Sequence, residues 1–271
     1  MRLRILCAGL VTALLAIYAM LEPFWFQIKH LTLTDSDVPA AFEGSRIVFL
    51  SDIHYGRNFP RDRLRWLVRT VNELQPDLVI FGGDYYQWGR DLILPCFEEL
   101  QHIHAPLGKF GVLGNHDHFK DYAALARQGM QTAGIMLLDN RAQWVKRHGQ
   151  RFKIGGVGDL LTDNQNLTST LAGTRVEDFV MLISHNPEYV EQITTHNIDI
   201  VLSGHTHGGQ ITLFGLWAPF MELRYGRKYL KGIVKTPFTT VMISNGVGMV
   251  ALPLRFCARP DIIVLTLKRG Q

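Results

Sequence analysis

The fold is decided by a stretch in which an apolar run ends abruptly in polar groups: IVFLSDIH, residues 47–54. Four bulky apolar residues predict a short buried strand, and Asp52 and His54 follow it almost at once. The same arrangement, an apolar run followed by Gly, Ser, Asp, Asn or His, recurs near residues 82, 114, 184 and 203. Ligand sites of open α/β sheets form beyond the carboxyl ends of strands. These five places therefore predict one polar rim.

Around that stretch, short apolar runs alternate with helical patterns. Strands are expected at residues 47–50, 78–81, 111–113, 136–138, 152–155, 180–183, 200–202, 240–243 and 262–267. Helices are expected at 64–74, 92–103, 122–133 and 187–195, where apolar residues recur at helical spacing. The alternation predicts an α/β fold, and the closer spacing of the later runs predicts that part of the sheet is mixed or antiparallel.

Composition and charge exclude several classes of protein. The 271 residues are 47% hydrophobic and 19% charged, which excludes a disordered chain. Three cysteines far apart in the sequence exclude a disulfide framework and a CxxC zinc site. The net charge is +4, and no dense run of Lys or Arg indicates nucleic-acid binding. This mild basicity suits an anionic substrate or a membrane surface.

The amino terminus predicts a membrane anchor. Residues 5–21 are uncharged and mostly apolar, and Phe24, Trp25 and Phe26 follow where an interfacial aromatic belt would lie. A cleaved signal peptide is the alternative, but the potential cleavage site near Ala19 is poor. We therefore expect residues 1–30 to be an anchor with its interfacial segment, 31–44 a linker, and 45–271 one catalytic domain.

The polar clusters have the composition of a metal site. Asp52 and His54, like His205 and His207, stand two apart, so in extended chain each pair projects to one side. Mixed nitrogen and oxygen ligands suit Mn, Fe, Zn or Ni better than Ca or Mg. About seven such ligands are too many for one tetrahedral ion and suit two divalent ions roughly 3.5–4 Å apart.

The order and content of the motifs resemble those of the calcineurin-like metallophosphoesterase superfamily over residues 46–210. The matching motifs are Asp52-x-His54, Gly83-Asp84, Gly114-Asn115-His116-Asp117, His185 and Gly204-His205-x-His207. The resemblance implies a four-layer α/β/β/α sandwich with two metal ions. It implies that Asp52, His54 and His207 hold one ion, that Asn115, His185 and His205 hold the other, and that Asp84 bridges both. It also implies that His116 is the general acid, with Asp117 orienting its ring.

Two differences from known branches of the superfamily indicate which branch the chain resembles. Protein phosphatases of this superfamily carry Arg four residues after the bridging Asp, where this chain has Trp88. Purple acid phosphatases use a tyrosine ligand in a differently spaced first motif, where this chain has His54 in Asp52-x-His54. The carboxyl-terminal segment and Gly208-Gly209-Gln210 are similar to bacterial membrane-associated phosphodiesterases, including enzymes that cleave UDP-2,3-diacylglucosamine in lipid A synthesis. We therefore expect a bacterial inner-membrane location, with the side of the catalytic domain left open.

The segment 213–231 mixes aromatic, apolar and basic residues close to the last His motif. It suits either a lipid headgroup boundary or a loop packed on the domain. Arg224, Arg227 and Lys228 are its candidates for holding a substrate phosphate. The sequence thus predicts hydrolysis of a phosphodiester or pyrophosphate, with a lipid-linked substrate and membrane lipids as partners. A phosphomonoesterase and an inactive scaffold are the alternatives.

Overall fold

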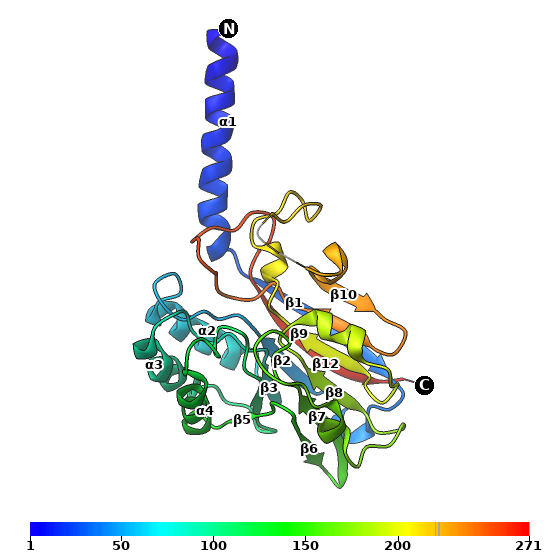
Figure 1. Cartoon of the computed structure of the whole chain (residues 1–271). Coiled ribbons are helices and arrows are strands. Elements are labelled where there is room, and N and C mark those ends of the chain that lie inside the picture. The colour runs from blue at the N-terminus through cyan, green and yellow to red at the C-terminus, as the bar shows by residue number, and fades with distance from the viewer. Residues whose placement is uncertain (220, 222, 271) are drawn as a thin grey trace.

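The computed structural model describes residues 1–219, 221 and 223–270. In this part of the chain the strands form two six-stranded sheets (Figure 1). The first has the order β1 (Gln27–Asp35), β12 (Asp261–Arg269), β2 (Arg46–Leu50), β3 (Leu78–Phe81), β4 (Lys109–Gly111), β5 (Ile135–Leu137). The second has the order β10 (Gly232–Lys235), β11 (Thr240–Ile243), β9 (Ile200–Ser203), β8 (Val180–Ile183), β7 (Gln150–Gly156), β6 (Arg141–Arg147).

Both sheets are mixed, as the spacing of the later runs predicts. In the first sheet β12 runs antiparallel to β2, and the other neighbours are parallel. In the second sheet the two edge pairs, β10–β11 and β6–β7, are antiparallel, and the central pairs are parallel. The parallel central strands direct their carboxyl ends to one edge of each sheet.

Alternation along the strands divides the core into three clusters. On β2, Val48 and Leu50 pack against the helices, whereas Ile47 and Phe49 face the second sheet. Since side chains alternate across a strand, each sheet is apolar on both faces. This arrangement confirms the predicted α/β sandwich of two sheets with helical segments outside.

The helical layers are unequal. Over the first sheet lie α2 (Arg61–Glu73), α3 (Arg90–Leu100) and α4 (Ala123–Thr132), of which α2 buries the predicted apolar stripe. Over the second lie α5 (Leu167–Leu171) and the 3₁₀ segments η3 (Pro187–Gln192) and η5 (Gly226–Tyr229). The 3₁₀ segments η2 (Ala40–Phe42) and η4 (His207–Gly209) lie in connections. The helix predicted at residues 187–195 is thus a short 3₁₀ segment.

The linker predicted at residues 31–44 is not one. The strand β1 pairs in parallel with β12 over its whole length, from Gln27 opposite Asp261 to Asp35 opposite Arg269. Val38 and Phe42, which follow it, are fully buried between the sheets. The folded domain therefore begins near residue 22, within the range predicted as the anchor and its interfacial segment.

The helix α1 (Arg2–Leu21) projects away from the domain, and most of its residues are exposed (Figure 1). Residues Arg4–Phe24 are long and apolar enough to cross a membrane, a property shared by anchors and signal sequences. At its foot the 3₁₀ segment η1 (Glu22–Phe24) buries Glu22 and Pro23 in the domain. The helix is therefore joined to the sandwich by packed residues.

Candidate dimetal site

The predicted metal ligands all follow the carboxyl ends of central strands. Asp52 and His54 follow β2, Asp84 follows β3, Asn115 follows β4, His185 follows β8, and His205 and His207 follow β9. Because the parallel strands of both sheets end on the same side, the structure brings all seven residues together. Most of these side chains are buried, and Asn115 and His205 are half-buried.

The backbone at these positions is unusual. Asp52, His54, Asp84, His205 and His207 all have positive φ, between 48° and 68°. This left-handed region disfavours residues with a Cβ by roughly 1–2 kcal/mol each. The loops that carry these residues are packed tightly against one another. A Cβ on Gly114 would collide with the carboxylate of Asp84, and one on Gly204 with that of Asp52. These glycines let the loops approach closely enough for the ligands to converge.

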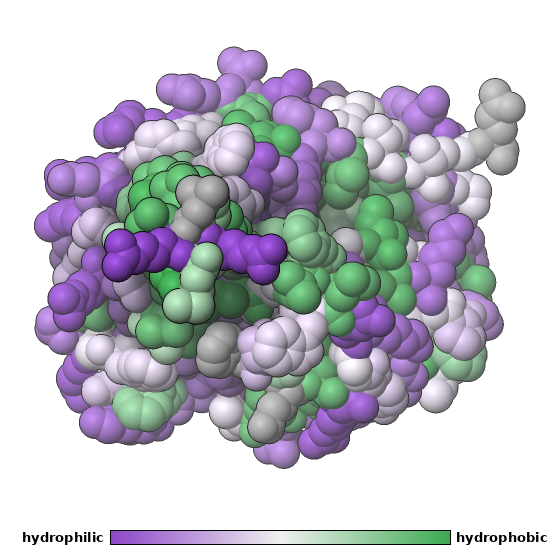
Figure 2. All heavy atoms as spheres, turned by 90° about the horizontal axis from the view of Figure 1, so that it is seen from above, coloured by the Kyte–Doolittle hydropathy of each residue, from purple (hydrophilic) through white to green (hydrophobic). Residues whose placement is uncertain are grey.

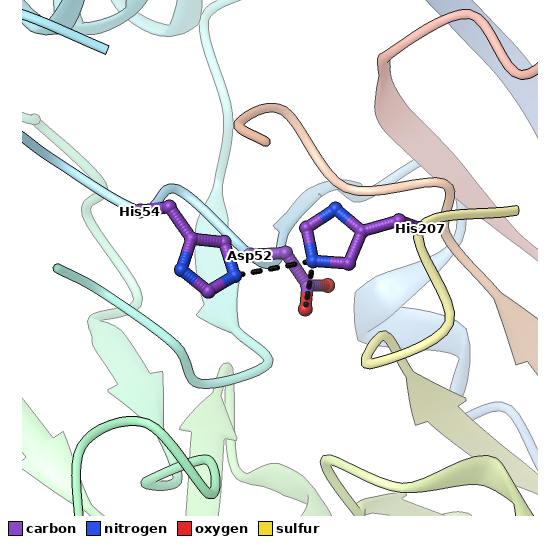
Figure 3. Close-up of side chains that lie close together, drawn as sticks. All are labelled: Asp52, His54 and His207. Carbon is purple, nitrogen blue, oxygen red and sulfur yellow. Dashed lines mark hydrogen bonds and ion pairs between the residues drawn. The ribbon is translucent and has the colours of Figure 1, made fainter. Parts of the chain in front are cut away.

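One group of ligands consists of Asp52, His54 and His207 (Figure 3). The Nε2 atoms of His54 and His207 lie 3.1 Å apart, and His207 Nε2 lies 3.4 Å from Asp52 Oδ1. Asp84 Oδ2 lies 3.5 Å from His54 Nε2 and so adjoins the group.

The second group surrounds the same Asp84 oxygen. His185 Nε2 lies 3.3 Å from Asp84 Oδ2 and 3.2 Å from Asn115 Oδ1. Asn115 Oδ1 also lies 2.9 Å from His205 Nδ1. His185 Nδ1 lies 2.7 Å from the carbonyl of Gly82, so this nitrogen donates and leaves the Nε2 lone pair facing the group.

These distances fit two ions that share Asp84. Donors about 2.0–2.2 Å from one ion lie roughly 3.0–3.5 Å from each other, which is close to the observed spacing. The carboxylate of Asp84 is suited to bridging because its Oδ1 accepts a hydrogen bond from the His116 amide, 2.9 Å away, while Oδ2 adjoins both groups. The buried Asp and His groups form a candidate dimetal site of the kind that suits Mn, Fe, Zn or Ni.

The electrostatics of the buried groups favour ligand binding. Burial lowers the pKa of His54 to about 3 and that of His205 to about 4, so both imidazoles are neutral at pH 7, the form that binds metals. Burial also opposes the charged form of Asp52, and for a carboxylate this raises the pKa, here to about 6. Burial opposes a charge on His185 too, yet the adjacent Asp84 carboxylate outweighs it and raises the His185 pKa well above its usual value. A cation in this position would replace that proton.

The predicted role of Asp117 is wrong. Its buried carboxylate accepts hydrogen bonds from the backbone amides of Asp84 (2.7 Å), Gly114 (2.8 Å) and Tyr85 (3.0 Å). It therefore holds the two loops that carry Asp84 and Asn115 together. The resemblance implied a contact with the ring of the preceding residue, but the turn at Asp117 directs its side chain inward.

The ring of His116 lies next to His54 and Asp84 of the site. It makes an edge-to-face contact with His54, at a centroid distance of 4.9 Å, and lies 5.5 Å from the ring of Trp88. It lines a cavity of about 350 Å³ together with Asp84, His205 and His207. His116 is thus placed to contact a substrate in that cavity.

Sequence reasoning missed Arg255, which is fully buried. Its guanidinium donates hydrogen bonds to the carbonyls of His207, Asn245, Gly246, Gly248 and Ala258. Gly248 in turn donates from its amide to the carbonyl of Asp52, at 2.7 Å. Arg255 thereby links the backbone of two ligands. The signal in the sequence was a single cation, Arg255, inside the otherwise apolar segment 252–258. Such a charge must either reach solvent or be buried with hydrogen-bonding partners.

The rest of the cavity wall is largely apolar, and the predicted phosphate-binding cations are elsewhere. Ile211, Met221 and residues 250–252 line it together with the ligands Asp84, His205 and His207. Among the described residues that line this cavity, Arg224, Arg227 and Lys228 do not occur. Lys228 Nζ lies 2.6 Å from a carboxylate oxygen of Glu191, whereas Arg224 and Arg227 are exposed.

Comparison with known proteins agrees with this geometry. The family model of the calcineurin-like phosphoesterases matches residues 45–209. The chain is 34% identical to the metallophosphoesterase YkuE of Bacillus subtilis, over 92% of this chain and 87% of that protein. It is 28% identical to the phosphodiesterase YaeI of Escherichia coli, over 91% and 90%. Among solved structures, the NAD nucleotidase of Haemophilus influenzae superposes with a TM-score of 0.51 at 13% identity, over 75% of this chain and 45% of that one.

Proposed function

The chain belongs to the calcineurin-like phosphoesterase family and is a metal-dependent phosphoesterase, and from that premise we propose that it hydrolyses a phosphodiester or pyrophosphate of a lipid-linked substrate. The observation that carries the proposal is the cavity beside the ligands, which is lined both by metal-binding groups and by apolar residues. Such a cavity accommodates a phosphate and an apolar substituent together.

We assign the seven ligands to two ions. Asp52, His54 and His207 would hold the first ion, Asn115, His185 and His205 the second, and Asp84 both, in keeping with the two groups of short distances. Two such ions would neutralise phosphoryl oxygens and lower the pKa of a water that serves as nucleophile.

The residues of the chain perform the remaining tasks. The imidazole of His116 is assigned the transfer of a proton to the leaving oxygen, because it lines the cavity next to His54. Asp117 and Arg255 hold the ligand-bearing loops in place through backbone hydrogen bonds. Preorganised loops keep the distances between donors fixed during turnover.

The preference for a diester rests on Trp88. A monoester has nearly two negative charges at pH 7 and benefits from an arginine clamp on its free oxygens. Here an indole lies beside the ring of His116, 5.5 Å away, and is more than half exposed. An indole at this edge provides an apolar surface for the second substituent of a diester.

The lipid-linked part of the proposal rests on α1 and the cavity wall. We propose that α1 anchors the chain in a bacterial cytoplasmic membrane, which would confine the enzyme to its substrate. Arg224 and Arg227, which are exposed and follow the cavity residue Met221 by three and six positions in the sequence, remain candidates for a second phosphate group. Lys228 is the weakest of the three because Glu191 already neutralises it.

The test compares substrates on the purified full chain at fixed metal loading. We expect kcat/KM for bis(4-nitrophenyl) phosphate to exceed that for 4-nitrophenyl phosphate by at least about tenfold, which corresponds to ~1.4 kcal/mol of transition-state binding. Arg224→Ala and Arg227→Ala should weaken a nucleoside diphosphate–lipid substrate more than the aryl diester, with Lys228→Ala as the matched control. Equal or greater efficiency on the monoester would favour a phosphomonoesterase instead.

A further inference from the structure

Residues 213–217 form a tight turn that exposes large apolar side chains. Leu213 is 52%, Phe214 74%, Leu216 66% and Trp217 63% exposed. The turn is closed by backbone hydrogen bonds from the Leu213 amide to the Trp217 carbonyl and from the Leu216 amide to the Leu213 carbonyl, each 2.9 Å long. Four large apolar side chains on a closed turn indicate an interaction surface. We call residues 213–217 the apolar turn.

The apolar turn lies beside the foot of α1, although nearly 200 residues separate them in the sequence. The amide of Thr212 donates to the carbonyl of Phe256, 2.8 Å away. The ring of Phe256 contacts that of Tyr18 in α1, at a centroid distance of 5.4 Å. The view along α1 shows further hydrophobic residues on the surrounding face of the domain, interspersed with hydrophilic ones (Figure 2).

The foot of α1 is fixed to the domain. The buried carboxylate of Glu22 accepts hydrogen bonds from the amides of Cys257 (2.7 Å) and Ala258 (2.8 Å). The amide of Arg255 donates to the carbonyl of Ala19, at 3.1 Å. If α1 spans the bilayer, these contacts determine which face of the domain meets the membrane, and that face carries the apolar turn.

We propose that the apolar turn inserts into the interfacial region of the bilayer and forms a second membrane contact beside α1. The proposal rests on the anchoring role proposed for α1. Trp, Phe and Leu side chains next to exposed cations are typical of surfaces that bind the headgroup region. Here the exposed cation is Lys231, whose side chain lies against Gly215 of the turn, and Phe24 and Trp25 expose further aromatic rings at the end of α1. Continuity with the end of a membrane-spanning helix favours lipid over a second copy of the chain as the occupant.

A membrane contact at the apolar turn would define the route by which a lipid substrate reaches the ligands. Ile211 of the cavity wall adjoins the apolar turn in sequence and pairs with Phe256, and Leu252 lies on the same wall. The side-chain amide of Gln210 donates to the carbonyls of Val250 (2.8 Å) and Leu252 (3.2 Å), which ties the two segments together. These contacts connect apolar residues of the cavity wall to the segments that carry the membrane-facing surface. A substrate could place its phosphate at the ligands while its acyl chains stay in the leaflet.

The first test measures depth without requiring activity. The full chain is reconstituted in phosphatidylglycerol–phosphatidylcholine vesicles containing brominated acyl chains, which quench tryptophans near the hydrocarbon. Trp217→Phe should lower the quenched fraction of the emission. The control Trp144→Phe, in β6 at the opposite end of the domain (Figure 1), should leave it unchanged or slightly higher. If Trp217→Phe and Trp144→Phe have the same effect, or cross-linking shows the turn between two copies, the proposal is overturned.

The second test uses turnover. Trp217→Asp should slow hydrolysis of a bilayer-embedded substrate at least about fivefold and leave a soluble aryl diester unaffected. Ile233→Asp, at a comparably exposed apolar residue of β10, is the control and should leave both rates unchanged. Equal losses for the two variants would contradict the proposal. A chain without any phosphodiesterase activity would refute the proposed function, whereas the quenching result would still stand.

Discussion

At the scale of single residues, Asp84 is the position on which both ligand groups depend. Its Oδ2 lies 3.5 Å from His54 and 3.3 Å from His185. Asp84→Ala should therefore lose both ions and all turnover, because each ion loses a ligand and a negative charge. Elemental analysis of the purified variant measures the metal content, with Asp163→Ala, a partly exposed carboxylate outside both groups, as the control. Retention of two ions per chain would contradict the bridging assignment.

His116 is expected to behave in the opposite way. The variant His116→Ala should keep its metals, because none of the short distances that define the two ligand groups involves its ring. The rate should fall roughly 10²- to 10⁴-fold, the usual contribution of a general acid. Steady-state kinetics should show a smaller loss for a nitrophenolate leaving group, which needs no proton. A metal-free His116→Ala protein would mean that the residue is a ligand.

Arg255 is the residue that links backbone segments around the first ligand group. Arg255→Ala leaves several buried carbonyls without donors, at roughly 1–3 kcal/mol for each group that water cannot reach. We expect a large drop in melting temperature and weaker metal binding, followed by thermal unfolding and metal titration. Arg259→Ala is the matched control, because that side chain is partly exposed and donates to the carbonyls of Trp25 and Phe26. Equal effects of the two changes would rule out a special role for Arg255.

At the scale of elements, the central strands and the convergence of the polar residues that follow them could be predicted because each local signal is strong. In β2, β3 and β8, four buried apolar residues are followed within two positions by Asp, Gly or His, and this pattern marks the end of the strand. The edge strands β1, β6 and β10 could not be predicted, because the alternation of apolar and polar residues along them is weak. The strand β1, for example, has the sequence QIKHLTLTD. Its identity as a strand depends on β12, more than 200 residues away. Arg255 and Asp117 act through contacts with distant backbone, which no local pattern encodes.

The position of β1 determines where the chain can be shortened. Removal of residues 2–17 should give a soluble protein with full turnover on a small soluble diester, because the side chains of α1 that the structure describes are exposed over that range. Removal of residues 2–35 should abolish folding, because it exposes the edge of β12 and deletes Glu22. Circular dichroism and metal content distinguish the two. A folded, active protein lacking residues 2–35 would show that β1 is dispensable.

At the scale of the whole molecule, the ionisation of Asp199 makes the stability of the sandwich depend on pH. Its Oδ2 accepts a hydrogen bond from the Val180 amide at 2.6 Å, and Asp35 and Asp37 lie close to it. Burial, with the neighbouring carboxylates, raises the pKa of Asp199 to about 7 from its usual 3.8. Between those values the folded state holds a proton that the unfolded state has lost, so this group makes stability fall as pH rises from about 4 to about 7.

Asp199→Asn removes that titration. We expect the variant to melt like the wild type at pH 4 and higher than it at pH 8, since the amide resembles the protonated carboxyl. A gain of about 1 kcal/mol would raise the melting temperature by about 2–4 °C in a protein of this size. Thermal unfolding at the two pH values measures the difference. A gain that is the same at both would attribute the effect to packing instead of charge.

Five of the proposed metal ligands have left-handed backbone, so the conformation that the site needs lowers the stability of the metal-free fold. Asp52, His54, Asp84, His205 and His207 occupy a conformation that suits glycine and, less well, asparagine. Substitutions that relax these turns would raise the stability of the metal-free fold and abolish catalytic activity. A search for thermostable variants that selects on folding alone would therefore drift toward inert proteins, whereas selection in the presence of metal and substrate would keep the strained positions intact.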